Sequence, residues 1–202
     1  MSIENRYKQL NIPFTEHIES VRFVNDKPEL PGFDDGPRNL ILKLSETLIG
    51  PPSRYCFKDH TDIIDPSNGL CCSEFVLHVL KETQKSFPDL LIPNVRYANE
   101  MWDNLGISIS SKYARPGDLI FYSHYGSVPK HVGIFFGITV TGSRYMIDSE
   151  GEAGGHIVLS QISDNYRYKK YVDDPLYENG LLGYKRLTIK TSNSRWPQLP
   201  IK

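Results

Sequence analysis

Apolar residues recur at helical spacing in three stretches of the first half of the chain. The first begins at the helix-start signal 35–37, which places a proline near the first helical position, and stops at the glycine and prolines of 50–52. The second starts at Cys72 and must end before Pro88, with an apolar stripe of Phe75, Val76, Val79 and Leu80. A third helix is predicted from about Asn94 to Leu105. We interpret its apolar stripe as core: Tyr97, Ala98, Met101, Trp102 and Leu105.

After Gly106 the pattern changes to the short apolar runs that are typical of strands. Strands are predicted at 118–122, 131–137, 144–149, 156–159 and 182–189. Helices followed by an antiparallel meander indicate one α+β domain, in which the Cys72 helix packs on the sheet. We assign residues 37–190 to this domain, residues 1–36 to an N-terminal arm and residues 191–202 to a polar C-terminal tail.

Composition narrows the classes of partner and compartment. The formal net charge is −1 and no basic run exceeds two residues, which argues against nucleic acid and anionic membranes as partners. The first residues lack the apolar core of a signal peptide, and the longest apolar run, 132–140, is too short to span a bilayer. The three cysteines, Cys56, Cys71 and Cys72, favour a reducing compartment over a disulfide framework, and a vicinal disulfide would be strained. We therefore expect a protein that is cytoplasmic as synthesised.

Cys72 is the first candidate for chemistry. It lies in the first turn of a buried helix, where backbone N–H groups without helical acceptors and the helix dipole favour a thiolate. A cysteine in that position can be a nucleophile; the alternative is a small apolar residue at a helix start. Adjacent cysteines diverge on a helix and no spaced Cys/His set resembles a zinc site, so we expect no metal and no cofactor.

A thiolate nucleophile needs a base, and the base needs an orienting partner. Among six histidines, His131 begins a predicted strand. Alternation along this strand and the next gathers one apolar face: Val132, Ile134, Phe136, Tyr145 and Ile147. His131 and Asp148 share the other face, and a four-residue loop at 138–141 would place them directly opposite each other, about 5 Å apart. The alternatives are a strand-end histidine bonded to a loop carbonyl and a solvated acid; Glu150 and His156 also lie near Asp148 in the chain.

Three blocks of the chain resemble the signature blocks of the NlpC-type cysteine peptidases, papain-like bacterial enzymes of cell-wall peptide cleavage. They read CSEFV at 72–76, RPGDLIFY at 115–122 and HVGIFFG at 131–137, in the family's order. The resemblance implies a papain-like fold over roughly 37–190, with Cys72 as nucleophile, His131 as base and Asp148 as the third polar residue. It also makes Tyr55 the candidate for an upstream tyrosine that contacts the active site. Ser73 would contribute its backbone N–H, with that of Cys72, to an oxyanion hole.

The chain departs from the family pattern around the expected substrate cleft. Cys71 stands where the family usually has aspartate, and Glu74 where it usually has glycine. The glycine pair common after the upstream tyrosine is replaced by 56–58 (CFK), and the third polar residue is most often histidine rather than aspartate. These changes are compatible with the chemistry and put the usual substrate in question.

The sequence therefore predicts a cysteine peptidase or amidase that acts on a short peptide through an acyl-enzyme, with bacterial cell-wall peptide as the leading substrate. Two alternatives remain open: an acyltransferase or deamidase on a related fold, and an inactive peptide-binding module. Three routes to substrate also remain open, namely recycling of wall fragments in the cytoplasm, export as an antibacterial effector by a dedicated machine, and a phage enzyme.

Overall fold

The computed structural model describes residues 35–50, 69–125, 128–138, 144–150, 156–162 and 180–190. The helices among them are α2 (Asp35–Thr47), α3 (Cys72–Ser86), α4 (Ala98–Asn104) and the short 3₁₀ helix η3 (Ser111–Tyr113). The strands are β1 (Ile107–Ile109), β2 (Leu119–Tyr125), β3 (Val128–Ile138), β4 (Arg144–Glu150), β5 (His156–Ile162) and β6 (Leu181–Arg186). Nearly all of the expected N-terminal arm, Tyr55, Cys56 and the C-terminal tail lie outside the described residues.

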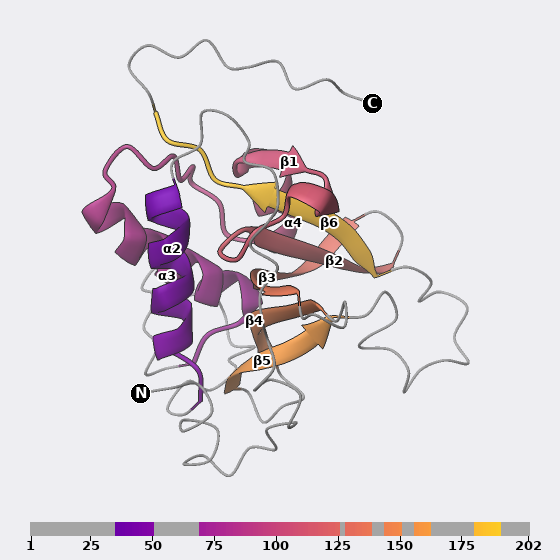
Figure 1. Ribbon diagram of the computed structural model, residues 1–202. Coiled ribbons are helices and arrows are strands. Elements are labelled where there is room, and N and C mark those ends of the chain that lie inside the picture. The colour runs from indigo at the N-terminus through magenta and orange to yellow at the C-terminus, as the bar shows by residue number, and fades with distance from the viewer. Residues whose placement is uncertain are drawn as a thin grey trace, which may run out of the picture.

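The described strands form one six-stranded antiparallel sheet in the order β1-β6-β2-β3-β4-β5. Strands β2 to β5 follow one another as the predicted meander, while β6 returns to lie between β1 and β2 (Figure 1). The α+β prediction is confirmed. The sequence reading missed β1, whose three residues are too short to show a periodic pattern.

Two of the three predicted helices have the expected bounds, and the third is shorter. α4 begins at Ala98, not near Asn94, because Tyr97 is its N-cap residue and the Glu100 carboxylate accepts the backbone N–H groups of Arg96 (2.7 Å) and Tyr97 (3.3 Å). The cap leaves Tyr97 45% exposed, so its assignment to the core was wrong, whereas Met101 is buried as expected. No described helix is long and apolar enough to cross a membrane.

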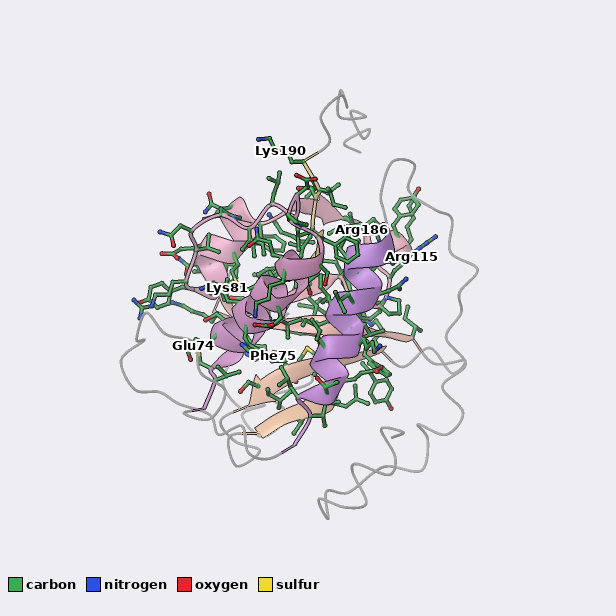
Figure 2. The ribbon with its side chains drawn as sticks, turned by 90° about the vertical axis from the view of Figure 1, so that its left-hand side faces the viewer. Glu74, Phe75, Lys81, Arg115, Arg186 and Lys190 are labelled. Atoms are coloured by element: carbon green, nitrogen blue, oxygen red, sulfur yellow. The ribbon has the colours of Figure 1, made fainter. Side chains whose placement is uncertain are left out.

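The main core lies between the helices and one face of the sheet. α3 packs against β3 and β4, and α2 packs on α3, so that both helices lie over the strands (Figure 2). Phe75, Val76, Val79 and Leu80 of α3 belong to this core. So do all five strand residues that were predicted to share an apolar face: Val132, Ile134, Phe136, Tyr145 and Ile147. The side chains that alternate with them on the strands form a smaller cluster, which includes Ile120, Tyr122, Phe135, Met146 and Tyr184.

A buried ion pair fastens β6 to the start of β2. Arg186 donates from Nε to Asp118 Oδ1 (2.8 Å) and from Nη2 to Asp118 Oδ2 (2.7 Å), and the backbone N–H of Arg115 also reaches Oδ2 (2.7 Å). Gly117 precedes the aspartate with φ near +91°, and a Cβ there would lie 2.3 Å from the carbonyl oxygen of Arg38 in α2. The RPGD sequence therefore joins β2, β6 and α2, which makes its role structural.

Candidate active site

Cys72 is the first residue of α3. The first helical hydrogen bond runs from the Phe75 N–H to the Cys71 carbonyl at 2.9 Å, so the N–H groups of Cys72 and Ser73 precede the ladder. Cys72 is 7% exposed and belongs to the main core cluster. The thiol is thus held in the first turn, as the sequence predicted.

Cys71 and Glu74 cap this helix reciprocally. The Glu74 carboxylate accepts the Cys71 N–H at 3.0 Å, and the Cys71 side chain accepts the Glu74 N–H. The Cys71 sulfur also lies 3.3 Å from Ser73 Oγ. Cys71 and Glu74, two departures from the family pattern, therefore form one structural unit. A thiol is a weaker cap than a carboxylate, and here it is paired with the acid three residues later, Glu74, at the start of α3 (Figure 2).

The environment of Cys71 separates it from its neighbour. Both cysteines are thiols. Burial raises the pKa of the Cys71 thiol, and the hydrogen bond with Ser73 lowers it by less. A raised pKa leaves little thiolate at neutral pH, so Cys71 suits capping rather than nucleophilic attack.

His131 and Asp148 form a buried pair between β3 and β4. His131 Nε2 lies 2.9 Å from Asp148 Oδ2, and the aspartate is wholly buried while the histidine is 4% exposed. Ser160 on β5 donates its hydroxyl to the other carboxylate oxygen, Oδ1, at 2.8 Å. An acid bonded on both oxygens can hold an imidazole in one orientation and stabilise its charged form.

The predicted contact between these two residues occurs, but the predicted register was wrong. The observed partners are Ile134 with Ile147 and Phe135 with Met146, so His131 lies diagonal to Asp148 rather than directly opposite it. The shift near the site is two residues, which preserves the faces, and a bulge between Phe135 and Gly137 takes up a further residue. The diagonal contact passes Gly133, where a Cβ would lie 3.1 Å from the Asp148 Cβ.

A hydrogen bond joins the segment before the nucleophile to the strand of the acid. Ser149 Oγ donates to the Leu70 carbonyl at 2.5 Å, and these residues adjoin Asp148 and Cys71 in the chain. Cys72 shares its core cluster with Val132 and Ile147, the sequence neighbours of His131 and Asp148. The residue two before Cys72 and the residue after Asp148 are therefore joined directly, and Cys72 packs among core-face residues that adjoin the pair in the chain.

Tyr122 and Ser160 are site residues that sequence reasoning missed. Tyr122 pairs with His131 across β2 and β3, with ring centroids 6.5 Å apart, and it is buried. The strand pattern marked Tyr122 only as a β2 residue, and the predicted strand 156–159 ended one residue before Ser160. Finding either contact required the pairing of strands, which local alternation does not contain.

The structure does not place the remaining sequence candidates in this cluster. Tyr55, expected to contact the site, lies outside the described residues. His78 is half-buried on α3, two turns beyond Cys72. Within the described part of the chain, no group of three His, Cys, Asp or Glu side chains could hold a metal ion.

Comparison with known proteins gives one family. The model of the NlpC/P60 family matches residues 58–174, more than half of the chain. No curated protein matches.

Solved structures from both bacteria and a protist resemble the fold. An NLP/P60-family, lipoprotein-like protein from Staphylococcus aureus is 23% identical, with a TM-score of 0.49, over 80% of this chain and 44% of its own. The P60 domain of a M. avium subspecies paratuberculosis antigen is 21% identical, with a TM-score of 0.44, over 72% of this chain and 92% of its own. NlpC1 from Trichomonas vaginalis is 20% identical, with a TM-score of 0.45, over 79% of this chain and 47% of its own. The chain spans less than half the length of the first and third of these proteins.

The family match and the architecture agree. A helix that opens with a cysteine packs on an antiparallel sheet, as expected of a papain-like α+β fold. On the strength of the family model, which spans most of the sheet and the whole of α3, this protein belongs to the NlpC/P60 family.

Proposed function

We propose that this protein is a cysteine hydrolase that cleaves an amide bond in a short peptide, with Cys72 as nucleophile, His131 as base and Asp148 as the orienting acid. The observation that carries the proposal is the buried 2.9 Å contact between His131 Nε2 and Asp148 Oδ2, next to the strand residue that binds the segment before Cys72. The family, whose members are generally cysteine peptidases or amidases of cell-wall peptides, supports the same reaction class.

The proposed first step forms a thioester. Because Nε2 of His131 is engaged by Asp148, Nδ1 takes the proton from the Cys72 thiol. The thiolate attacks the amide carbonyl carbon, and the N–H groups of Cys72 and Ser73, which precede the helical ladder, stabilise the oxyanion. The protonated His131 then gives its proton to the departing amine as the C–N bond breaks, leaving the acyl group on the Cys72 sulfur.

The second step returns the enzyme to its starting state. His131 removes a proton from water, the hydroxide attacks the thioester carbonyl, and the Cys72 thiolate leaves and is reprotonated. Asp148 stabilises the imidazolium in both steps and keeps its own proton count unchanged. Side chains, two backbone N–H groups and water are enough for both steps.

Peptidoglycan stem peptide is the proposed substrate. The family acts on peptides of this kind. A cytoplasmic role in recycling of wall fragments, or export as an effector, would each bring the enzyme to this substrate.

Digestion of purified muropeptides, followed by mass spectrometry, tests the proposal. We expect the wild-type protein to release products with one amide bond hydrolysed, and Cys72→Ala and His131→Ala to release none. Hydrolysis that persists in Cys72→Ala would refute the nucleophile. A product that carries an added acyl group in place of a hydrolysed bond would reassign the protein to the acyltransferases, and the absence of any product would refute the substrate.

A further inference from the structure

Two neighbouring strands hold the Asp148 carboxylate at the same time. Oδ2 lies 2.9 Å from His131 Nε2 on β3, and Oδ1 accepts the Ser160 hydroxyl of β5 at 2.8 Å. Asp148 is wholly buried and Ser160 is 3% exposed, so bulk water does not compete for these bonds.

The strand register explains why Ser160 reaches the carboxylate. Asp148 is paired with Val158, and Met146 with Ser160, so Ser160 lies two residues along β5 on the same face as Asp148. His131 reaches Asp148 diagonally from β3 on the other side. The carboxylate is therefore fixed at both oxygens, which stops rotation about its Cβ–Cγ bond.

Resting on the proposed function, we infer that Ser160 is a positioning residue of the active site, whose hydroxyl holds Asp148 so that Oδ2 stays directed at the His131 imidazole. A hydroxyl that donates to a carboxylate stabilises the ionised form of the acid, and so opposes the effect of burial, which disfavours the charge. The ionised acid in turn stabilises the imidazolium, and the imidazolium stabilises the Cys72 thiolate. Ser160 acts through Asp148 and does not touch the substrate.

A purely structural role for Ser160 predicts a different result. If Ser160 only satisfied its own hydroxyl inside the sheet, its loss would lower the stability of the fold and leave the reactivity of Cys72 unchanged. The discriminating readout is therefore the thiolate of Cys72, which requires neither a known substrate nor turnover.

The test compares Ser160→Ala with Ser160→Thr, which keeps the hydroxyl, and with the control Ser45→Ala. Ser45 is also a buried serine, but its hydroxyl donates to the Ile41 carbonyl within α2. The measurement is the rate of Cys72 alkylation by iodoacetamide at neutral pH, located by peptide mass spectrometry, together with the ultraviolet absorbance of the thiolate relative to Cys72→Ala. We expect Ser160→Ala to slow Cys72 alkylation about tenfold, because the rate follows the fraction of Cys72 that is thiolate. The thiolate absorbance should fall as well. Ser160→Thr and Ser45→Ala should react as the wild type does.

Two results would overturn the inference: alkylation of Ser160→Ala at the wild-type rate, or Ser160→Thr as slow as Ser160→Ala. Other results would separate this inference from the proposed function. If Cys72 alkylation depends on Ser160 but no amide substrate is cleaved, the positioning role stands and the hydrolase proposal falls. If the wild type cleaves muropeptides and Ser160→Ala does so with unchanged kcat and KM, the hydrolase proposal stands and the positioning role of Ser160 falls.

Discussion

Gly133 is the position where one methyl group should damage the site most. It lies between His131 and Asp148 on their diagonal, and an alanine Cβ there would lie 3.1 Å from the Asp148 Cβ, 3.1 Å from the Ile147 carbonyl oxygen and 3.2 Å from the Met146 sulfur. Gly133 is not among the glycines with positive φ, so alanine meets a packing problem and no backbone strain. Gly133→Ala therefore isolates the effect of space next to the acid.

The size of the effect follows from which atoms can move. The Met146 side chain can yield, but the Ile147 carbonyl is part of the β4 backbone and the Asp148 Cβ can move only with it, and β4 pairs with strands on both sides. Inserting a methyl group into such a site costs about 1–3 kcal/mol of unfolding free energy. For a chain of this size each kcal/mol lowers Tm by about 2–4 °C. Displacement of β4 also moves Asp148 from His131, so we expect Cys72 alkylation to slow as well.

The chain offers a matched control. Gly180 also lacks a positive φ, and an alanine there would meet its nearest atoms, the Ser123 carbonyl oxygen and a Tyr122 ring carbon, at 3.4 Å, which is ordinary contact. Thermal unfolding followed by circular dichroism gives Tm, and iodoacetamide labelling gives the Cys72 rate. A Gly133→Ala protein that is as stable and as reactive as Gly180→Ala would refute this account of the site.

The buried ion pair, the helix cap and the second cysteine each lead to a measurable result. Asp118→Ala removes the partner of the buried Arg186 and should lower the unfolding free energy by about 3–5 kcal/mol in urea titrations, and an unchanged midpoint would contradict the fastening role. Glu74→Ala should cost about 0.5–2 kcal/mol, which Cys71→Asp should recover in the double variant, because aspartate is the better cap; no recovery would argue against the reciprocal cap. Burial raises the pKa of the Cys71 thiol, so its alkylation should lag behind that of Cys72 at neutral pH and accelerate as the pH rises toward that pKa. Equal rates for the two cysteines at neutral pH, measured by peptide mapping, would contradict this.

Local patterns were enough to predict the scaffold. Helical spacing and stop signals located α2 and α3, and alternation assigned Val132, Ile134 and Ile147 to the core face and His131 and Asp148 to the other. These features depend on residues close together in the chain, because a helix or strand presents its faces through its own periodicity. The face assignment also survived an error of two residues in register, since side chains alternate with a period of two.

The contacts that complete the site depended on the tertiary structure. The register of β3 on β4 includes a bulge between Phe135 and Gly137, and the bond from Ser160 to Asp148 depends on the pairing of a third strand. The pairing of Cys71 with Glu74 could have been read from their spacing, but its outcome, a buried thiol that caps the helix, depends on what packs around it. The sequence by itself determined which residues face the same way. Only the folded sheet decided which of them touch, because a strand's partners come from distant parts of the chain.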